Sequence, residues 1–266
     1  MIRLGICTDI ANIDLVAEIG YDYMETGLSG LAALSDEEFE AVAGRAARAR
    51  IRVEACNGMM PASIPVTGPG VNAQAIHDYL NRAFARAKRL GVEVVVFGSS
   101  GARNVPEGFD IAQAWRQIGN FLRLAQSHAK ESGITIAIEP LRKGESNIIN
   151  YVSEAVCLSS LLQLSNVRAL GDTYHMEVGS EPWSALTLAG PMLAHVHTAN
   201  ALGRILPREG DGEDYEAIFR ALKAGGYDAR VSCEAGCNDF ESDARAAFQV
   251  LDRTRRLVWQ APETNG

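Results

Sequence analysis

Short apolar segments alternate with longer helical patterns along the whole chain, and this alternation constrains the fold more than any other feature. Helical patterns are clearest at 36–50, 72–91 and 111–133, and shorter ones lie at 12–19, 153–163, 181–189, 213–224 and 239–258. The segments with the length and composition of strands are 3–7, 23–26, 52–56, 93–98, 135–139, 167–172, 193–198 and 230–234. Strands this apolar are typical of a parallel sheet that helices cover on its outer side.

Eight consecutive strand–helix units predict an α/β protein in which the sheet closes into a (β/α)8 TIM barrel. A doubly wound open sheet is the structural alternative. However, no GxGxxG turn follows the first segment, and the number of units favours closure. The chain has 266 residues and no linker rich in Pro, Gly or Ser, so we expect a single TIM-barrel domain over residues 1–266.

Composition limits the classes of partner. The formal net charge of −8 argues against a nucleic-acid partner, which requires a basic face. No apolar run approaches the roughly 18 residues of a membrane span, and the opening "MIRLGICTD" is too short and polar for a secretory leader. The five cysteines are odd in number and lack CxxC spacing, which favours reduced thiols. We therefore expect a cytoplasmic protein that binds neither nucleic acid nor membranes and acts on a small molecule.

Ionisable residues stand at the ends of four neighbouring strands, where barrels of this kind collect functional groups. They are Glu139, Asp172, His197 and Glu234. Each alone has an ordinary explanation: a solvated loop residue, a helix cap or a core histidine. Together they form a set of oxygen ligands with one imidazole, which suits one divalent cation. We expect Mn²⁺ first, with Co²⁺, Mg²⁺ or Zn²⁺ as alternatives. Without a cation, three converging carboxylates would repel one another and raise their pKa values.

The two-residue period of a strand predicts which side chains point into the barrel. In "TIAIE", Thr135, Ala137 and Glu139 share one face, and the isoleucines share the face that packs against helices. In "HVH", His195 and His197 share a face, so we expect only one of them to bind the metal, with the other lower in the barrel.

Four motifs together resemble the xylose-isomerase-like TIM barrels and, within them, the D-tagatose and D-psicose 3-epimerase group. They are "IEPLRKGESNIIN" (138–150), "GDTYHM" (171–176), "HVHTAN" (195–200) and "SCEA" (232–235). The resemblance covers nearly the whole chain and implies a homodimer or homotetramer. It also implies that Glu139, Asp172, His197 and Glu234 hold the metal and that the two glutamates act as acid and base. Residues expected to contact the sugar or line its pocket are Glu145, His175, Arg204, Cys56 and Gly98.

The chemistry is consistent with this resemblance. Moving a proton next to a ketose carbonyl requires a cation that stabilises a cis-enediolate, and epimerisation requires a base on each face of the carbon. An aldose–ketose isomerase, a hydroxypyruvate-type isomerase or an inosose dehydratase could use the same set, so the reaction stays open. A nuclease like the abasic-site endonucleases and a non-catalytic barrel are more distant alternatives. The substrate is a sugar or a sugar phosphate; candidate phosphate contacts are Arg103, Lys143, Arg204 and Arg208.

Overall fold

The strands close into a parallel barrel in which each pairs with its neighbours in chain order and β8 pairs with β1. The chain is described here by a computed structural model that covers residues 1–260. The strands are β1 (Arg3–Cys7), β2 (Tyr23–Gly27), β3 (Val53–Asn57), β4 (Val94–Phe97), β5 (Thr135–Ile138), β6 (Val167–Asp172), β7 (Leu193–Thr198) and β8 (Arg230–Cys233). The predicted TIM barrel is confirmed.

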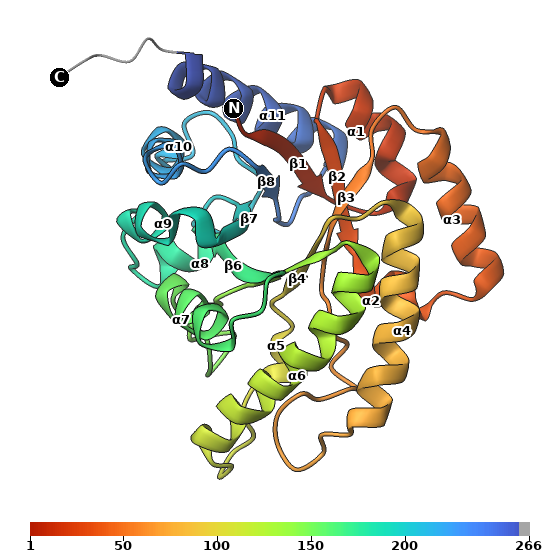
Figure 1. Cartoon of the computed structure of the whole chain (residues 1–266). Coiled ribbons are helices and arrows are strands. Elements are labelled where there is room, and N and C mark those ends of the chain that lie inside the picture. Colours follow the sequence, from red (N-terminus) through yellow and green to blue (C-terminus); the bar gives the residue numbers. More distant parts are fainter. Residues whose placement is uncertain (261–266) are drawn as a thin grey trace.

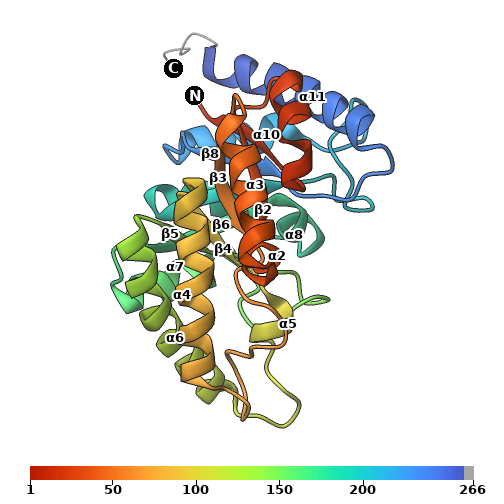
Figure 2. The ribbon, with the colours of Figure 1, turned by 90° about the vertical axis from the view of Figure 1, so that its right-hand side faces the viewer.

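Helices surround the barrel (Figure 1). They are α1 (Ile13–Ile19), α2 (Leu28–Ala33), α3 (Asp36–Arg48), α4 (Ala73–Leu90), α5 (Ser100–Arg103), α6 (Ile111–Ser132), α7 (Val152–Leu162), α8 (Thr173–Val178), α9 (Ser184–Ala189), α10 (Tyr215–Ala224) and α11 (Phe240–Gln260), with 3₁₀ turns η1 (Ile10–Asn12) and η2 (Gly190–Met192). The long helices α4 and α6 lie side by side, and α11 packs beside α1 and β1 (Figure 2). None of the helices in residues 1–260 is both long and apolar enough to cross a membrane.

The sequence marks the helix ends clearly. Ser35 and Glu38 form a capping box at the start of α3, and Asn72 caps α4 through its side chain. Gly91 follows α4 with a φ of +83°, a left-handed conformation that glycine adopts without steric cost. These signals explain why the long helices begin and end within one or two residues of the predicted bounds.

The buried apolar side chains form two clusters, one inside the barrel and a larger one between the sheet and the helices. Residues such as Ala137, Val96 and Leu170 fill the interior, whereas Ile136 and Ile138 belong to the larger cluster between sheet and helices. The predicted alternation in "TIAIE" is therefore confirmed. In parallel barrels the carboxyl ends of all strands meet at one mouth, where Glu139, Asp172, His197 and Glu234 lie.

Three helices fall outside the predicted bounds: α2, α5 and α8, of 6, 4 and 6 residues. Each follows its strand within a few residues, and each is too short to show an amphipathic repeat. Strands β5 and β8 end one residue earlier than predicted, at Ile138 and Cys233. Glu139 and Glu234 therefore begin loops, where their side chains can turn over the mouth of the barrel.

Candidate active site

Four side chains from consecutive strands converge at the mouth of the barrel. One ligand atom from each of Glu139, Asp172, His197 and Glu234 lies within 4.8 Å of the others. The atom they share as a neighbour is Nδ1 of His197, which lies 2.9 Å from a Glu139 oxygen, 3.6 Å from Glu234 and 3.8 Å from Asp172. The structure thus brings together the four residues that the strand ends predicted; we call them the carboxylate–histidine cage.

Asp172 serves two structural purposes at once. It is the last residue of β6 and the N-cap of α8, and its Oδ1 accepts a hydrogen bond of 3.1 Å from the His175 backbone N–H. Its other oxygen, Oδ2, faces His197 across the cage. The two interpretations of this aspartate, helix cap and metal ligand, are therefore compatible, because the cap fixes the carboxylate in the orientation that the cage needs.

Glu25 in β2 orients the imidazole of the cage. One of its oxygens lies 3.0 Å from Nε2 of His197, and the other lies 2.8 Å from Nε2 of His195. All three residues are fully buried. Because Nε2–H of His197 points at Glu25, its Nδ1 is directed to the cage, an arrangement that commonly accompanies histidine ligands of metals. His195 lies beside it and contacts Glu25 rather than the cage.

Opposite charges determine the protonation states of Glu25 and His197. Burial raises the pKa of Glu25, but His197 and His195 outweigh it and hold the pKa well below its ordinary value. For His197, burial lowers the pKa, and the opposing charges of Glu25 and Glu234 raise it well above the ordinary value. Both nitrogens of His197 therefore carry a proton and donate to carboxylates when no cation is bound.

Glu25 is a residue that the sequence reasoning missed. Glu25 lies within the predicted strand 23–26, one residue before its end, and the predicted site includes only residues at the strand ends. The available signal was the two-residue period, which places Glu25 on the inward face with Tyr23. A buried inward glutamate requires a partner, and the inward histidines of "HVH" supply it.

The donor set fits a divalent cation. Burial and repulsion by Glu139 raise the pKa of Asp172 to about 8, although its ordinary value is 3.8. Three carboxylates in this space compete for one imidazolium, and a cation in the place of the Nδ1 proton would neutralise them better. The described residues therefore have the ligand types, burial and spacing of a site for Mn²⁺, Co²⁺, Mg²⁺ or Zn²⁺.

Gly98 leaves room for the Glu139 carboxylate. It follows β4, and a Cβ built at this position would lie 2.0 Å from Oε2 and 3.1 Å from Cδ of Glu139. Real Cβ contacts of that length do not occur, so any other residue at 98 would push the carboxylate away. Gly98 lies next to the cage and acts through Glu139, and its predicted contact with the sugar stays a prediction.

His175 presents an unpaired donor near the cage. The backbone N–H of Arg142 donates to Nδ1 of His175, so the ring proton lies on Nε2. Nε2 is buried, has no hydrogen-bond partner among residues 1–260, and lies 3.8 Å from Asp172 and 4.0 Å from Glu145. Burial and the charge of Arg204 lower the pKa of His175 to about 4, so the ring is neutral near pH 7. A buried N–H without a partner is suited to a substrate oxygen.

Arg204 links the cage to Glu145. Its guanidinium donates to Glu234 at 2.7 Å and to Glu145 at 3.4 Å, and it lies 4.8 Å from the centre of the Tyr174 ring. Its φ of +50° is in the left-handed region, which costs a non-glycine residue about 1–2 kcal/mol. The Gly236 N–H donates to the Arg204 carbonyl at 2.9 Å and helps to hold this conformation. The structure thus places Arg204, Glu145 and His175 together beside the cage.

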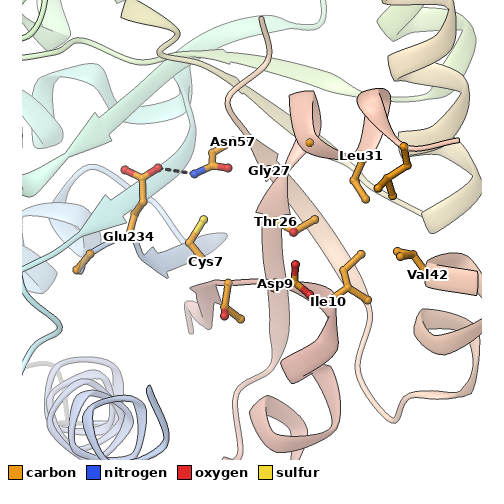
Figure 3. A pocket seen from close by; sticks show the side chains of 13 residues that line it. Cys7, Asp9, Ile10, Thr26, Gly27, Leu31, Val42, Asn57 and Glu234 are labelled. Atoms are coloured by element: carbon orange, nitrogen blue, oxygen red, sulfur yellow. Dashed lines mark hydrogen bonds between the residues drawn. The ribbon is translucent and has the colours of Figure 1, made fainter. Parts of the chain in front are cut away.

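Cys56 is not brought to the site. It is fully buried in the core between sheet and helices, on the opposite face of β3 from Ala55. The strand extends one residue beyond the predicted end, and Asn57 takes the inward position. The Asn57 amide donates to Oε1 of Glu234 at 2.6 Å (Figure 3). Asn57 is a second residue that the sequence reasoning missed.

The three remaining candidate phosphate contacts, Arg103, Lys143 and Arg208, do not join the cage. The fully buried Arg103 donates to the backbone oxygens of Phe97 and Ile149, so it supports the strand-four loop. Lys143 is exposed and lies over the Tyr151 ring, and Arg208 is exposed.

Comparison with known proteins places the chain in a family. The profile of the xylose isomerase-like TIM barrel family matches residues 13–255. The chain belongs to this family.

Several proteins that are similar to this chain in sequence are named as epimerases. D-psicose 3-epimerase of Agrobacterium fabrum is 24% identical over 200 residues, which cover 73% of this chain and 68% of the relative. 3-Dehydro-D-guloside 4-epimerase of Escherichia coli is 29% identical over 120 residues, which cover 45% of each protein. A crystal structure of D-psicose 3-epimerase in the presence of D-fructose shares the fold, with a TM-score of 0.82 over 96% of this chain and 99% of that one, at 20% identity. The predicted isomerase class is confirmed, and the reaction, substrate and metal stay predictions.

Proposed function

We propose that the chain is a divalent-metal-dependent sugar epimerase that moves a proton at the carbon next to a ketose carbonyl. The observation that carries this proposal is the position of Glu139 and Glu234, which face the same imidazole nitrogen from β5 and β8 at 2.9 and 3.6 Å. Two carboxylates on opposite sides of one substrate carbon can remove a proton from one face and return a proton to the other.

Each residue would have a distinct part in this reaction. Burial raises the pKa of Glu139, but its hydrogen bond to His197 outweighs this and lowers the pKa, so the carboxylate is ionised and able to act as a base. Arg204 and Asn57 hold the two oxygens of Glu234. Nε2–H of His175 would donate to the substrate oxygen beside the reacting carbon, and Glu145 and Arg204 would bind neighbouring hydroxyls.

Glu139, Asp172, His197 and Glu234 would hold the metal, with Glu25 fixing the imidazole. The cation would supply the positive charge that stabilises the enediolate form of the substrate. We propose Mn²⁺, with Co²⁺, Mg²⁺ or Zn²⁺ as alternatives, because oxygen ligands predominate and the cage has no thiolate.

A second candidate is the same proton transfer on a keto-glycoside. It is favoured by the similarity to 3-dehydro-D-guloside 4-epimerase, whose name describes a reaction next to a ketone within a glycoside. A hydroxypyruvate-type isomerase and an inosose dehydratase remain rivals that would use the same cage.

An assay panel tests the proposal. Purified protein with Mn²⁺ is incubated in ²H₂O with free ketohexoses, hydroxypyruvate, inosose and a 3-oxo-glucoside. Epimerisation is expected to place one deuterium on the inverted carbon, because the proton is exchanged through the glutamates. Loss of water from inosose, or conversion of hydroxypyruvate alone, would contradict it.

The acid–base assignment is tested by Glu139→Gln and Glu234→Gln, which keep side-chain size but remove the base. We expect each to lower kcat by about 10²–10⁴-fold. The matched control is Glu37→Gln, an exposed glutamate in the first turn of α3, which should be neutral. Full activity in both cage variants would reject the assignment.

A further inference from the structure

A cavity of about 570 Å³ opens directly beside the cage. Glu234 lies on its wall, whereas Glu139, Asp172 and His197 do not. A sugar whose reacting carbon lies between the two glutamates would therefore extend past Glu234 into this cavity. Pockets that hold ligands of drug-like size measure roughly 300–1,000 Å³. The molecule thus has room for a second chemical group next to the sugar.

Hydrogen-bonding side chains lie on one side of the cavity and apolar side chains on the other, with Asp9 beside Ile10 (Figure 3). Asn57 and Glu234 lie on one side, joined by their hydrogen bond. Ile10, Leu31 and Val42 lie on the other side, and they come from η1, α2 and α3. A ligand that extends from Glu234 across the cavity therefore contacts hydrogen-bonding groups at one side and hydrocarbon at the other.

A missing side chain contributes to this space. Gly30 in α2 lines the cavity, and a Cβ built on it would have no heavy atom within 4 Å. Glycine within a helix costs about 1 kcal/mol relative to alanine, and the backbone of Gly30 does not have the positive φ that would require it. Space for a ligand is an explanation for glycine here that the local backbone does not supply.

The charge of the walls indicates which group fits. Among residues 1–260, those that line the cavity include the carboxylates of Asp9 and Glu234 but no lysine, arginine or histidine. The Cys7 thiol is also neutral, because burial and the charge of Glu25 raise its pKa well above the ordinary value. A phosphate or carboxylate would lack a counter-charge and would be repelled. The cavity is suited to an uncharged, mainly apolar group.

We propose that this cavity binds an uncharged apolar substituent on the sugar, so that the substrate is a keto-glycoside with an aryl or alkyl group. The inference rests on the second candidate of the proposed function, proton transfer on a keto-glycoside, and specifies the class of its substituent. The ketone must remain free for proton transfer at its neighbouring carbon, so it lies at a ring position other than the glycosidic carbon. A free ketose would leave the apolar side of the cavity unfilled, and a sugar phosphate would place its charge against carboxylates.

The test compares two probes that differ only in the substituent. They are the 3-oxo derivatives of methyl and phenyl β-D-glucopyranoside, titrated into the Mn²⁺-loaded protein by calorimetry. We expect the phenyl compound to bind at least about tenfold more tightly, since even one methylene in an apolar pocket is worth about tenfold or more. Equal affinities, or no binding of either probe, would overturn the inference.

Two variants of one residue locate the effect. Gly30→Trp should fill the apolar side of the cavity and abolish the preference for the phenyl probe. Binding of the methyl probe and of Mn²⁺ should stay unchanged. Gly30→Ala adds one methyl group and should keep most of the preference. A phenyl preference that survives in Gly30→Trp would contradict the assignment, and the wild-type comparison decides alone if this variant does not fold.

The outcomes separate this inference from the proposed reaction. Epimerisation of free ketohexoses without a phenyl preference would reject the substituent site and leave the reaction intact. A phenyl preference that Gly30→Trp removes, without epimerisation of any sugar, would support the site and reject the reaction.

Discussion

The two sides of the barrel mouth are built on opposite principles. On the β5–β8 side, three buried ionisable groups and the partly buried Glu234 lie within 4.8 Å of one another, and each depends on its neighbours. On the β1–β3 side, Ile10, Leu31 and Val42 surround open space. Glu234 belongs to both sides. The difference indicates that the chemistry is concentrated in the cage, while the cavity can vary the substrate without disturbing it.

This contrast also predicts how substitutions behave. Removing one member of a buried ionic cluster leaves the others with uncompensated charge, so effects there should be large and not additive. Apolar walls contribute through contact area, so changes there should be graded.

A glycine-to-alanine substitution should have very different effects on kcat on the two sides of the mouth. Gly98→Ala should displace the Glu139 carboxylate, because the new Cβ would lie 2.0 Å from Oε2. A misplacement of about 1 Å can cost about 100-fold in rate, and we expect kcat to fall by at least that factor. Gly30→Ala is the matched control, since its Cβ meets no atom within 4 Å. Equal kcat values for the two variants would remove the distinction between the sides.

Glu25→Gln tests how far the cage depends on the layer beneath it. A glutamine keeps the size but loses the charge that pairs with both imidazoles, so His197 would be held less firmly. We expect Mn²⁺ affinity to fall by about 10–100-fold, measured by electron paramagnetic resonance titration.

The control is Glu54→Gln, a buried glutamate that pairs with Arg3 and Arg230 instead of the histidines. It should lower the melting temperature without changing Mn²⁺ affinity. If both variants bind Mn²⁺ as the wild type does, Glu25 has no positioning role.

Metal affinity should depend on pH, because the close carboxylates of the cage hold a proton when no cation is bound. Asp172, with a pKa of about 8, keeps its proton below that pH when no cation is bound, and a metal must displace it. The metal must also displace the Nδ1 proton of His197, whose pKa is raised well above its ordinary value. Mn²⁺ affinity should therefore rise by about 100-fold per pH unit between about pH 6 and pH 8, and less steeply once Asp172 is ionised. Calorimetry in buffers of different ionisation enthalpy would count the released protons. A flat affinity would show that no ligand loses a proton on binding.

The barrel and the cage were predictable because both follow from local pattern. The alternation of strands and helices fixes the fold, and Glu139, Asp172, His197 and Glu234 stand at consecutive strand ends. Their convergence then follows from the geometry of the barrel.

Glu25, Asn57 and the cavity could not be predicted, because they depend on how far down the barrel a residue lies and on the register of its strand. Glu25 lies one level below the strand ends, so its role is visible only when β2 and β7 are placed in one barrel. The resemblance placed Cys56 at the pocket, but the side chains of β3 alternate, and the inward position belongs to Asn57. The cavity depends on residues from β1, η1, β2, α2, α3 and β3 and on the absence of a side chain at Gly30, which no local pattern encodes.

The central claim is that the carboxylate–histidine cage binds a divalent metal, and Asp172→Asn tests it most directly. Asparagine is as good an N-cap as aspartate, so α8 should keep its start while the cage loses a charge. We predict that the wild type binds one Mn²⁺ per chain and that the variant, folded by circular dichroism, loses both Mn²⁺ and activity. The loss of affinity should exceed the roughly 10–100-fold expected for an outer partner such as Glu25. A variant that retains wild-type Mn²⁺ affinity and activity would contradict the account and leave Asp172 as a helix cap alone.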